Sequence, residues 1–243
     1  MKKELFACVL IGGAPVKSAD HWLQYMEQQM RGDQSKAELN MKITTPTWQR
    51  ELEIRTDVKG EDEALTFIDS PAKEKGIGTL RLGNNMWNYF PKLKRKVTVS
   101  PSMLLASWMG SDFTNDDLLK ASSMYEDYNH TFKPDEKIGK TTYKVIDNVA
   151  KSDSKVIWPR ILTLADKKDC LPRFHRYYDK KGTLIRTLAL SDVKTFDGHK
   201  VPSYWEMTPH KETGRKTILV YKKLAFKVNF AKDHFTMKNL TDN

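Results

Sequence analysis

The side chains that most often carry catalysis or hold metal ions are present in this sequence, but they are not grouped. The six histidines are scattered, with no pair at metal-ligand spacing: His21, His130, His175, His199, His210 and His234. The sequence contains neither a glycine-rich phosphate-binding loop nor a nucleophile elbow. We therefore predict a protein that is not an enzyme and that uses no cofactor and no metal.

Three aspartates lie close together at Asp112, Asp116 and Asp117. Their spacing lacks the alternating oxygen donors and the glutamate of an EF-hand calcium loop. Thr114 followed by two acidic residues is instead typical of a capped helix start. Asp112 is expected to bond its own backbone in a turn. Helix capping is therefore favoured over calcium binding.

The first eighteen residues have the pattern of a secretory signal peptide. Met1 is followed by two lysines, an apolar run extends from Leu5 to Ala14, and small residues precede Ser18. The apolar run is too short to span a bilayer, and an ordinary N-terminal strand is the alternative. We predict a signal peptide over residues 1–18 and one domain over 19–243. Cleavage would leave Cys170 as the only cysteine, so no intramolecular disulfide and no thiol metal site are expected.

Length and charge favour a folded, water-soluble chain. The 243 residues are 39% hydrophobic, which is enough for a core, and the formal net charge is +10. Because lysine and arginine are spread along the chain, the charge indicates a soluble surface more than a nucleic-acid partner. We expect no nucleic-acid binding.

The stretch from residue 87 to 119 links two strand-rich halves. After an alternating strand at 86–90 and Pro91 come four cations, Lys92, Lys94, Arg95 and Lys96. This cationic run is predicted to contact a lipid headgroup or an acidic partner, with a solvated loop as the alternative. The apolar segment that follows, 101–109, is predicted to form a short helix that begins after Ser100 and breaks at Gly110. This helix is either core filling or a lid over an apolar cavity.

The remaining periodicity predicts one amphipathic helix and many short strands. Residues 20–31 have apolar side chains on one helical face, and Gly32 ends the helix. From residue 37 the period changes to two. Strands are predicted at 37–43, 48–56, 64–68, 78–82, 86–90, 95–99, 123–132, 141–149, 155–165, 173–178, 184–190, 193–196, 201–208, 217–228 and 235–237. Tight turns at Gly83-Asn84 and Asp197-Gly198 are expected to close two hairpins.

These elements predict a mainly β (α+β) fold with a single, strongly curved antiparallel sheet and a few helices on its concave face. One face of each strand is polar, so only one side of the sheet is expected to be covered. The helices are too few to fill the concavity, which would leave an apolar groove. The side chains expected to line it are Trp22, Met26, Met30, Leu39, Met41, Ile43, Leu52, Ile54, Trp87, Tyr89, Met103, Leu104 and Trp108.

Several short motifs, in this order and spacing, closely resemble the outer-membrane lipoprotein-sorting protein family, the LolA-like periplasmic proteins of Gram-negative bacteria. The most specific are Trp87-x-Tyr89-x-Pro91 and the run from Gly110 to Phe113. The others lie at 75–80, 126–130, 177–182, 196–198, 214–217 and 235–236, so the resemblance extends from Trp22 to Leu240.

The resemblance implies a LolA/LolB-like half-barrel of about eleven strands with helices forming a lid. It also implies a periplasmic chaperone that shelters acyl chains of a lipoprotein or another lipid, in trafficking linked to outer-membrane biogenesis. A membrane exporter of the resistance-nodulation-division superfamily, or an outer-membrane acceptor, is the implied partner. The alternative function is an adaptor or sensor that docks on a membrane transporter without carrying lipid.

Overall fold

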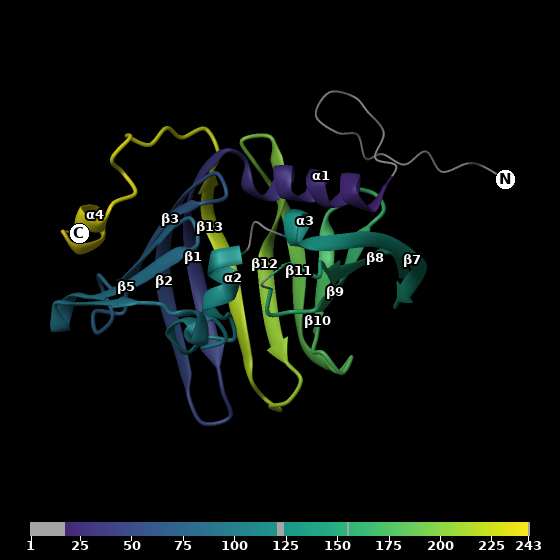
Figure 1. The fold of residues 1–243 in the computed structure, drawn as a ribbon, viewed down its shortest axis with the longest axis horizontal. Coiled ribbons are helices and arrows are strands. Elements are labelled where there is room, and N and C mark those ends of the chain that lie inside the picture. The colour runs from purple at the N-terminus through teal and green to yellow at the C-terminus, as the bar shows by residue number, and fades with distance from the viewer. Residues whose placement is uncertain (1–17, 121–123, 155, 243) are drawn as a thin grey trace.

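The chain, in a computed structural model, is built on one antiparallel sheet of 13 strands (Figure 1). The structure describes residues 18–120, 124–154 and 156–242, so the predicted signal peptide lies outside the described residues except for Ser18. The strands are β1 (Gln34–Thr44), β2 (Gln49–Lys59), β3 (Glu63–Ser70), β4 (Gly78–Leu82), β5 (Asn85–Phe90), β6 (Arg95–Thr98), β7 (Tyr128–Ile138), β8 (Thr141–Ala150), β9 (Arg160–Asp166), β10 (Pro172–Tyr178), β11 (Leu184–Phe196), β12 (His199–Pro209) and β13 (Lys216–Ala225). The helices are α1 (Ala19–Arg31), α2 (Asn115–Lys120), α3 (Met124–Asp127) and α4 (Met237–Thr241), and the 3₁₀ turns are η1 (Pro91–Leu93), η2 (Pro101–Met103) and η3 (Trp108–Gly110).

The strand order explains how the chain encloses its interior. Strands β1 to β6 follow one another from the middle of the sheet to one edge, and β7 to β13 return from the opposite edge until β13 pairs with β1. The chain between β6 and β7 must therefore pass from one edge to the other, and its described residues, 99–120 and 124–127, are here called the crossing segment. Figure 1 shows α2 and α3 in front of the sheet and α1 lying across one end of the strands. The mainly β prediction is confirmed, with 13 strands in place of about eleven.

Both predicted two-residue turns are present and close their hairpins. Leu82 pairs with Asn85 across Gly83, whose φ is 56°, and Phe196 pairs with His199. Asp197 and Gly198 both have positive φ, as the tight turn favoured in twisted hairpins requires.

Helix α1 forms where predicted because both of its ends are capped. The Ser18 hydroxyl accepts a hydrogen bond from the His21 N–H, and Gly32 ends the helix with a φ of 62°. A Cβ at Gly32 would lie 2.8 Å from the ring of Phe226, so only glycine fits this close approach.

The crossing segment does not form the helix predicted for residues 101–109. It contains the two 3₁₀ turns η2 and η3, and the chain then reverses so that Ser107 pairs with Thr114. Met109 and Gly110 have φ of 50° and 76°, which interrupts any helix. The reversal places Trp108 and Phe113 side by side in the interior, an arrangement that a straight helix would not give.

Three other local predictions are also wrong. Within the strand predicted at 123–132, Met124–Asp127 form helix α3. The strand predicted at 235–237 contains only the cap residue Thr236, the residue before it and the first residue of helix α4, Met237. The two strands predicted at 184–190 and 193–196 form the single strand β11, which has an irregular residue at Asp192 with a φ of 53°.

The sheet is covered on more than its concave face, contrary to the prediction from strand polarity. The main core lies on the concave side and includes side chains from β1, β2, β11 and β12. A smaller core on the opposite face of β3 and β4 is covered by the C-terminal segment, through Phe235 and Leu240. This segment leaves the end of β13 and runs sideways toward the half of the sheet that contains β3 and β5, beside which α4 lies (Figure 1).

Cys170 is fully buried and disulfide-bonded in the full chain, whereas the expectation of no disulfide applies to the chain after cleavage and stays a prediction. The other cysteine, Cys8, lies outside the described residues. Within the described part of the chain, no helix combines the length and apolar character needed to cross a bilayer.

Candidate ligand-binding cavity

A cavity of about 380 Å³ lies between the concave face of the sheet, helix α1 and the crossing segment. Its wall is mostly apolar and comes from both halves of the sheet. The apolar lining includes Met26, Met30, Leu39, Met41, Ile54, Met86, Leu188, Leu190, Met207 and Leu219. The sheet therefore has a hollow that its own side chains leave under-filled.

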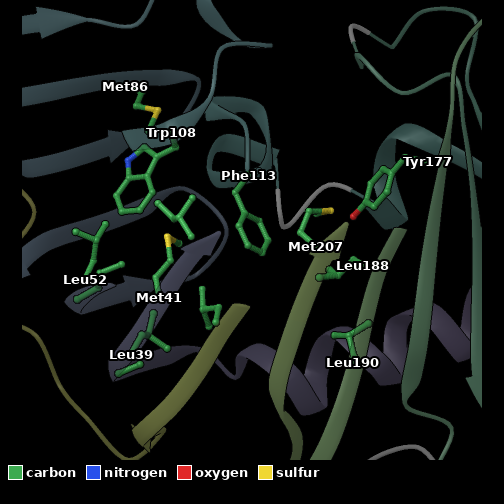
Figure 2. Packing of buried hydrophobic residues seen from close by; sticks show 14 of the residues in the cluster. Leu39, Met41, Leu52, Met86, Trp108, Phe113, Tyr177, Leu188, Leu190 and Met207 are labelled. Carbon is green, nitrogen blue, oxygen red and sulfur yellow. The ribbon is translucent and has the colours of Figure 1, made fainter. Parts of the chain in front are cut away.

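Trp108 and Phe113 reach into this interior from the crossing segment. Figure 2 shows both rings directed toward the side chains of the strands, with Met86 beside Trp108. The Trp108 Nε1–H donates to the hydroxyl of Thr79 at 3.1 Å, which satisfies the only polar atom of the indole side chain. The crossing segment thus fills part of the cavity.

A buried ion pair fixes the crossing segment to the sheet. The Arg186 guanidinium donates to both carboxylate oxygens of Asp117, at 2.8 and 2.5 Å, and to the backbone carbonyl of Asp112. It lies 4.4 Å from the ring centroids of both Trp158 and Tyr177. Burial lowers the pKa of Arg186, but the Asp117 carboxylate outweighs this effect and holds it above its ordinary value.

Asp112 and Asp117 both bind side chains that are far away in the sequence, which the local motifs did not predict. The Asp112 carboxylate accepts from Arg215 Nε and from the Thr217 hydroxyl, so the predicted turn bond to its own backbone is wrong. Asp117 does complete the predicted helix cap, because it accepts from the Thr114 N–H at 2.6 Å while its own N–H donates to the Thr114 hydroxyl.

Charged side chains line the cavity near the C-terminal end of α1. Glu27, Arg31 and Arg81 lie there and are partly exposed. Burial raises the pKa of Glu27 to about 7, with Arg31 opposing the rise and Glu61 adding to it. Burial also lowers the pKa of both arginines, and for Arg81 the charge of Arg31 adds to the decrease. These three side chains thus form a charged part of a mostly apolar lining.

The raised pKa of Glu27 predicts a pH effect on stability. Glu27 holds its proton up to about pH 7 in the folded protein and only to about pH 4.5 in the unfolded chain. Its contribution to the free energy of unfolding therefore falls as the pH rises through this window. Glu27→Gln is therefore expected to be more stable than wild type at pH 8, with the difference shrinking toward pH 5. Urea unfolding at both pH values measures it.

The control is Glu53→Gln, because Glu53 lies on the surface in an exposed pair with Lys222. It is expected to show no such pH-dependent difference from wild type. A Glu27→Gln protein less stable than wild type at pH 8 would contradict the assignment.

Six of the thirteen predicted groove residues line the cavity: Met26, Met30, Leu39, Met41, Ile54 and Trp108. Ile43 and Leu52 are buried in the same core without lining the cavity, and Met103 and Leu104 pack against that core half-buried. Trp22 is buried elsewhere, edge-on against Phe132 of β7.

Trp87 and Tyr89 lie on the wrong face for a groove, so the predicted parity of β5 is wrong. Both pack against the smaller core that the C-terminal segment covers, while Met86 on the same strand lines the cavity. Both faces of β5 carry large apolar side chains, so alternation alone could not choose between them.

The sequence interpretation missed the half of the wall that comes from β9 to β13. Residues such as Tyr177, Leu188 and Met207 line the cavity and come from strands whose alternation was recognised. The sequence therefore contained the necessary information. The apolar side chains at alternate positions of these strands could have been predicted to point into the groove, as they were for β1 and β2. Figure 2 shows Leu188, Leu190 and Met207 facing Leu39 and Met41 across the interior.

The cationic run lies away from the cavity, at η1 and the edge strand β6. Lys92, Lys94, Arg95 and Lys96 are all exposed, and within the described chain none of the four forms an ion pair. Leu93, in the middle of the run, is 72% exposed.

The described residues contain no group of three His, Cys, Asp or Glu side chains placed to hold a metal ion. His175 is the one histidine that lines the cavity.

Comparison with known proteins identifies the architecture. A model of a protein family described as "uncharacterized protein" matches residues 60–242. No curated protein matches the sequence. A DUF1329 family protein from Desulfovibrio piger is similar in structure, with a TM-score of 0.84 and 23% identity over 93% of this chain and 99% of that one.

Two further solved structures share the architecture. A domain from Vibrio parahaemolyticus described as outer-membrane lipoprotein-sorting has a TM-score of 0.80 and 24% identity, covering 92% of this chain and 98% of its own. A LolA superfamily protein from Nitrosomonas europaea has a TM-score of 0.78 and 19% identity, covering 92% and 99%. The fold is therefore LolA-like, as predicted.

Proposed function

The chain belongs to the family of uncharacterized proteins whose model spans residues 60–242, and from its cavity we propose that it is a lipid carrier. It would shelter the acyl chains of a lipoprotein or another lipid in the hollow of the curved sheet. No catalytic step is part of this proposal. The structural relative described as lipoprotein-sorting is consistent with it, since that protein has the same fold.

The cavity is the observation that carries the proposal. Its volume of about 380 Å³ lies within the range of about 300–1,000 Å³ typical of small-ligand sites. Six methionines line it, and flexible thioethers adapt to chains of varying shape. Burying a 16-carbon chain would gain roughly 0.8 kcal/mol per methylene, on the order of 10 kcal/mol in total.

A carrier must also release its cargo, and the crossing segment offers a means. Trp108 and Phe113 occupy part of the interior, so a long acyl chain would have to displace them or lie beside them. The energy needed to move them would offset part of the burial energy of the chain. Release would then require less energy than full burial suggests.

We also propose a periplasmic location, with residues 1–18 as an export signal and 19–243 as the carrier domain. The cargo would pass between membranes, with a resistance-nodulation-division exporter or an outer-membrane acceptor as partner.

Native mass spectrometry of protein purified from cells tests the carrier function. We expect bound lipid, together with displacement of an acyl-chain fluorophore by added lipid. If the purified protein never carries lipid and does not bind the fluorophore, the carrier proposal fails. Crosslinking to a membrane transporter without lipid uptake would then support the adaptor or sensor function.

The cationic run is proposed to bring the carrier to an anionic membrane surface. Reversing two charges with Lys94→Glu and Lys96→Glu is expected to weaken binding to vesicles of anionic phospholipid at low salt. Since each lysine near such a surface contributes about 1 kcal/mol, the loss should be at least about tenfold. Vesicle co-sedimentation measures it.

The matched control reverses Lys180 and Lys181, which are exposed in the turn between β10 and β11. If binding is set by net charge alone, both double variants lose affinity equally, and the cationic run has no special role. The specific effect should disappear at about 1 M salt, where screening is nearly complete.

A further inference from the structure

His175 is a polar side chain set into the apolar wall of the cavity. It lies on β10 between Thr163 of β9 and Leu188 of β11, and it lines the cavity with only 9% of its surface exposed. Thr163 is fully buried behind it. A carrier that handled only hydrocarbon would be expected to have an apolar residue here, because a buried polar group without a partner is destabilising.

A chain of hydrogen bonds determines which ring nitrogen of His175 carries the proton. The Asn148 amide donates to the Ile161 carbonyl at 2.8 Å and to the Thr163 hydroxyl oxygen at 3.0 Å. Because the Ile161 carbonyl can only accept, this orientation of Asn148 is fixed. The Thr163 hydroxyl then has its own proton free to donate to His175 Nδ1, 3.0 Å away. Its other contact, with the Met124 sulfur at 3.9 Å, is a weak one.

This network favours the tautomer with the proton of His175 on Nε2, because a hydroxyl donates a stronger hydrogen bond to a ring nitrogen than to a thioether sulfur. Burial lowers the pKa of His175 to about 4, so the ring is neutral at physiological pH. Nε2–H has no hydrogen-bond acceptor among the residues that the structure describes. His175 thus presents a neutral hydrogen-bond donor at the cavity wall that no described residue accepts.

We propose that His175 Nε2–H binds the carbonyl oxygen of the acyl group of the guest, as found in an ester or an amide. This inference rests on the proposed carrier function and defines its ligand more closely. A carbonyl oxygen satisfies the donor, which a plain hydrocarbon chain leaves without a partner. An acylated protein and a free lipid share this chemistry.

The test compares two ligands of equal chain length, a fatty-acid methyl ester and the alkane that lacks the carbonyl. Displacement of an acyl-chain fluorophore from the delipidated full chain gives both affinities. Wild type is expected to prefer the ester about tenfold. In His175→Leu the preference should disappear while the alkane affinity is retained, and in the control Ala189→Leu, on the face of β11 that points away from the cavity, it should persist.

An unchanged ester preference in His175→Leu, or no preference in wild type, overturns the role of His175 and leaves the carrier function intact. Failure of wild type to bind either ligand counts instead against the carrier function. A diacylated peptide and a diacylglycerol, compared in the same assay, distinguish lipoprotein from free lipid as the source of the carbonyl.

A measurement on wild type alone covers the case in which the variant does not fold. Nitrogen NMR of the His175 ring should show the Nε2–H tautomer, and the Hε2 resonance should shift when the ester binds but not when the alkane binds. The Nδ1–H tautomer, or an Hε2 resonance that does not move with ester bound, contradicts the proposal.

Discussion

Replacing Asp117 with Asn is expected to lower the free energy of unfolding by about 3–5 kcal/mol, because it leaves the Arg186 cation buried without its counter-charge. Arg186 is 4% exposed in its side chain, and Asp117 is 15% exposed. Asparagine can still cap helix α2, so the loss should come from the ion pair and not from the cap. Urea unfolding monitored by tryptophan fluorescence measures it.

Two further variants separate burial from charge. Glu53→Gln breaks an exposed ion pair and should change the free energy of unfolding by less than about 1 kcal/mol. Adding Arg186→Met to Asp117→Asn should recover much of the loss, since it removes the unpaired cation. If Asp117→Asn is as stable as wild type, the ion pair does not hold the crossing segment in place.

Filling the cavity is expected to weaken lipid binding strongly without unfolding the protein. Leu190 of β11 lines the cavity, and Leu190→Trp would place an indole in the space proposed to hold the acyl chain. If the ring excludes about three methylenes of the chain, the loss is about 2.4 kcal/mol, or roughly fiftyfold in affinity. Because the indole fills empty space, stability should stay within about 1 kcal/mol of wild type, whereas a packed core would be strained by it.

The control uses the same substitution one residue away. Ala189 lies on the opposite face of β11, so Ala189→Trp adds the same side chain outside the cavity. Its lipid affinity should equal that of wild type in the fluorophore displacement assay. Full-strength lipid binding by Leu190→Trp would mean that lipid binds somewhere other than in this cavity.

The sequence by itself determined the features that depend on neighbouring residues. Helix α1 follows from its caps and one apolar face, the hairpins follow from Gly83-Asn84 and Asp197-Gly198, and the alternation in β1 assigned Leu39 and Met41 to the interior. Turns and helix caps involve only a few consecutive residues, so they can be predicted from the sequence before the fold is known. The LolA-like fold was also predicted, through short motifs.

Only the tertiary structure decided the features that join distant parts of the chain. The crossing segment forms turns in place of a helix because Trp108 must meet Thr79, and Asp117 must meet Arg186 from 69 residues away. Trp87 lies outside the groove because the C-terminal segment covers a second face of the sheet. His175 faces a cavity whose opposite wall comes from the other half of the chain. Which face of a strand is buried depends on the distant segments that pack against it. The local periodicity of the strand is the same whichever face is buried.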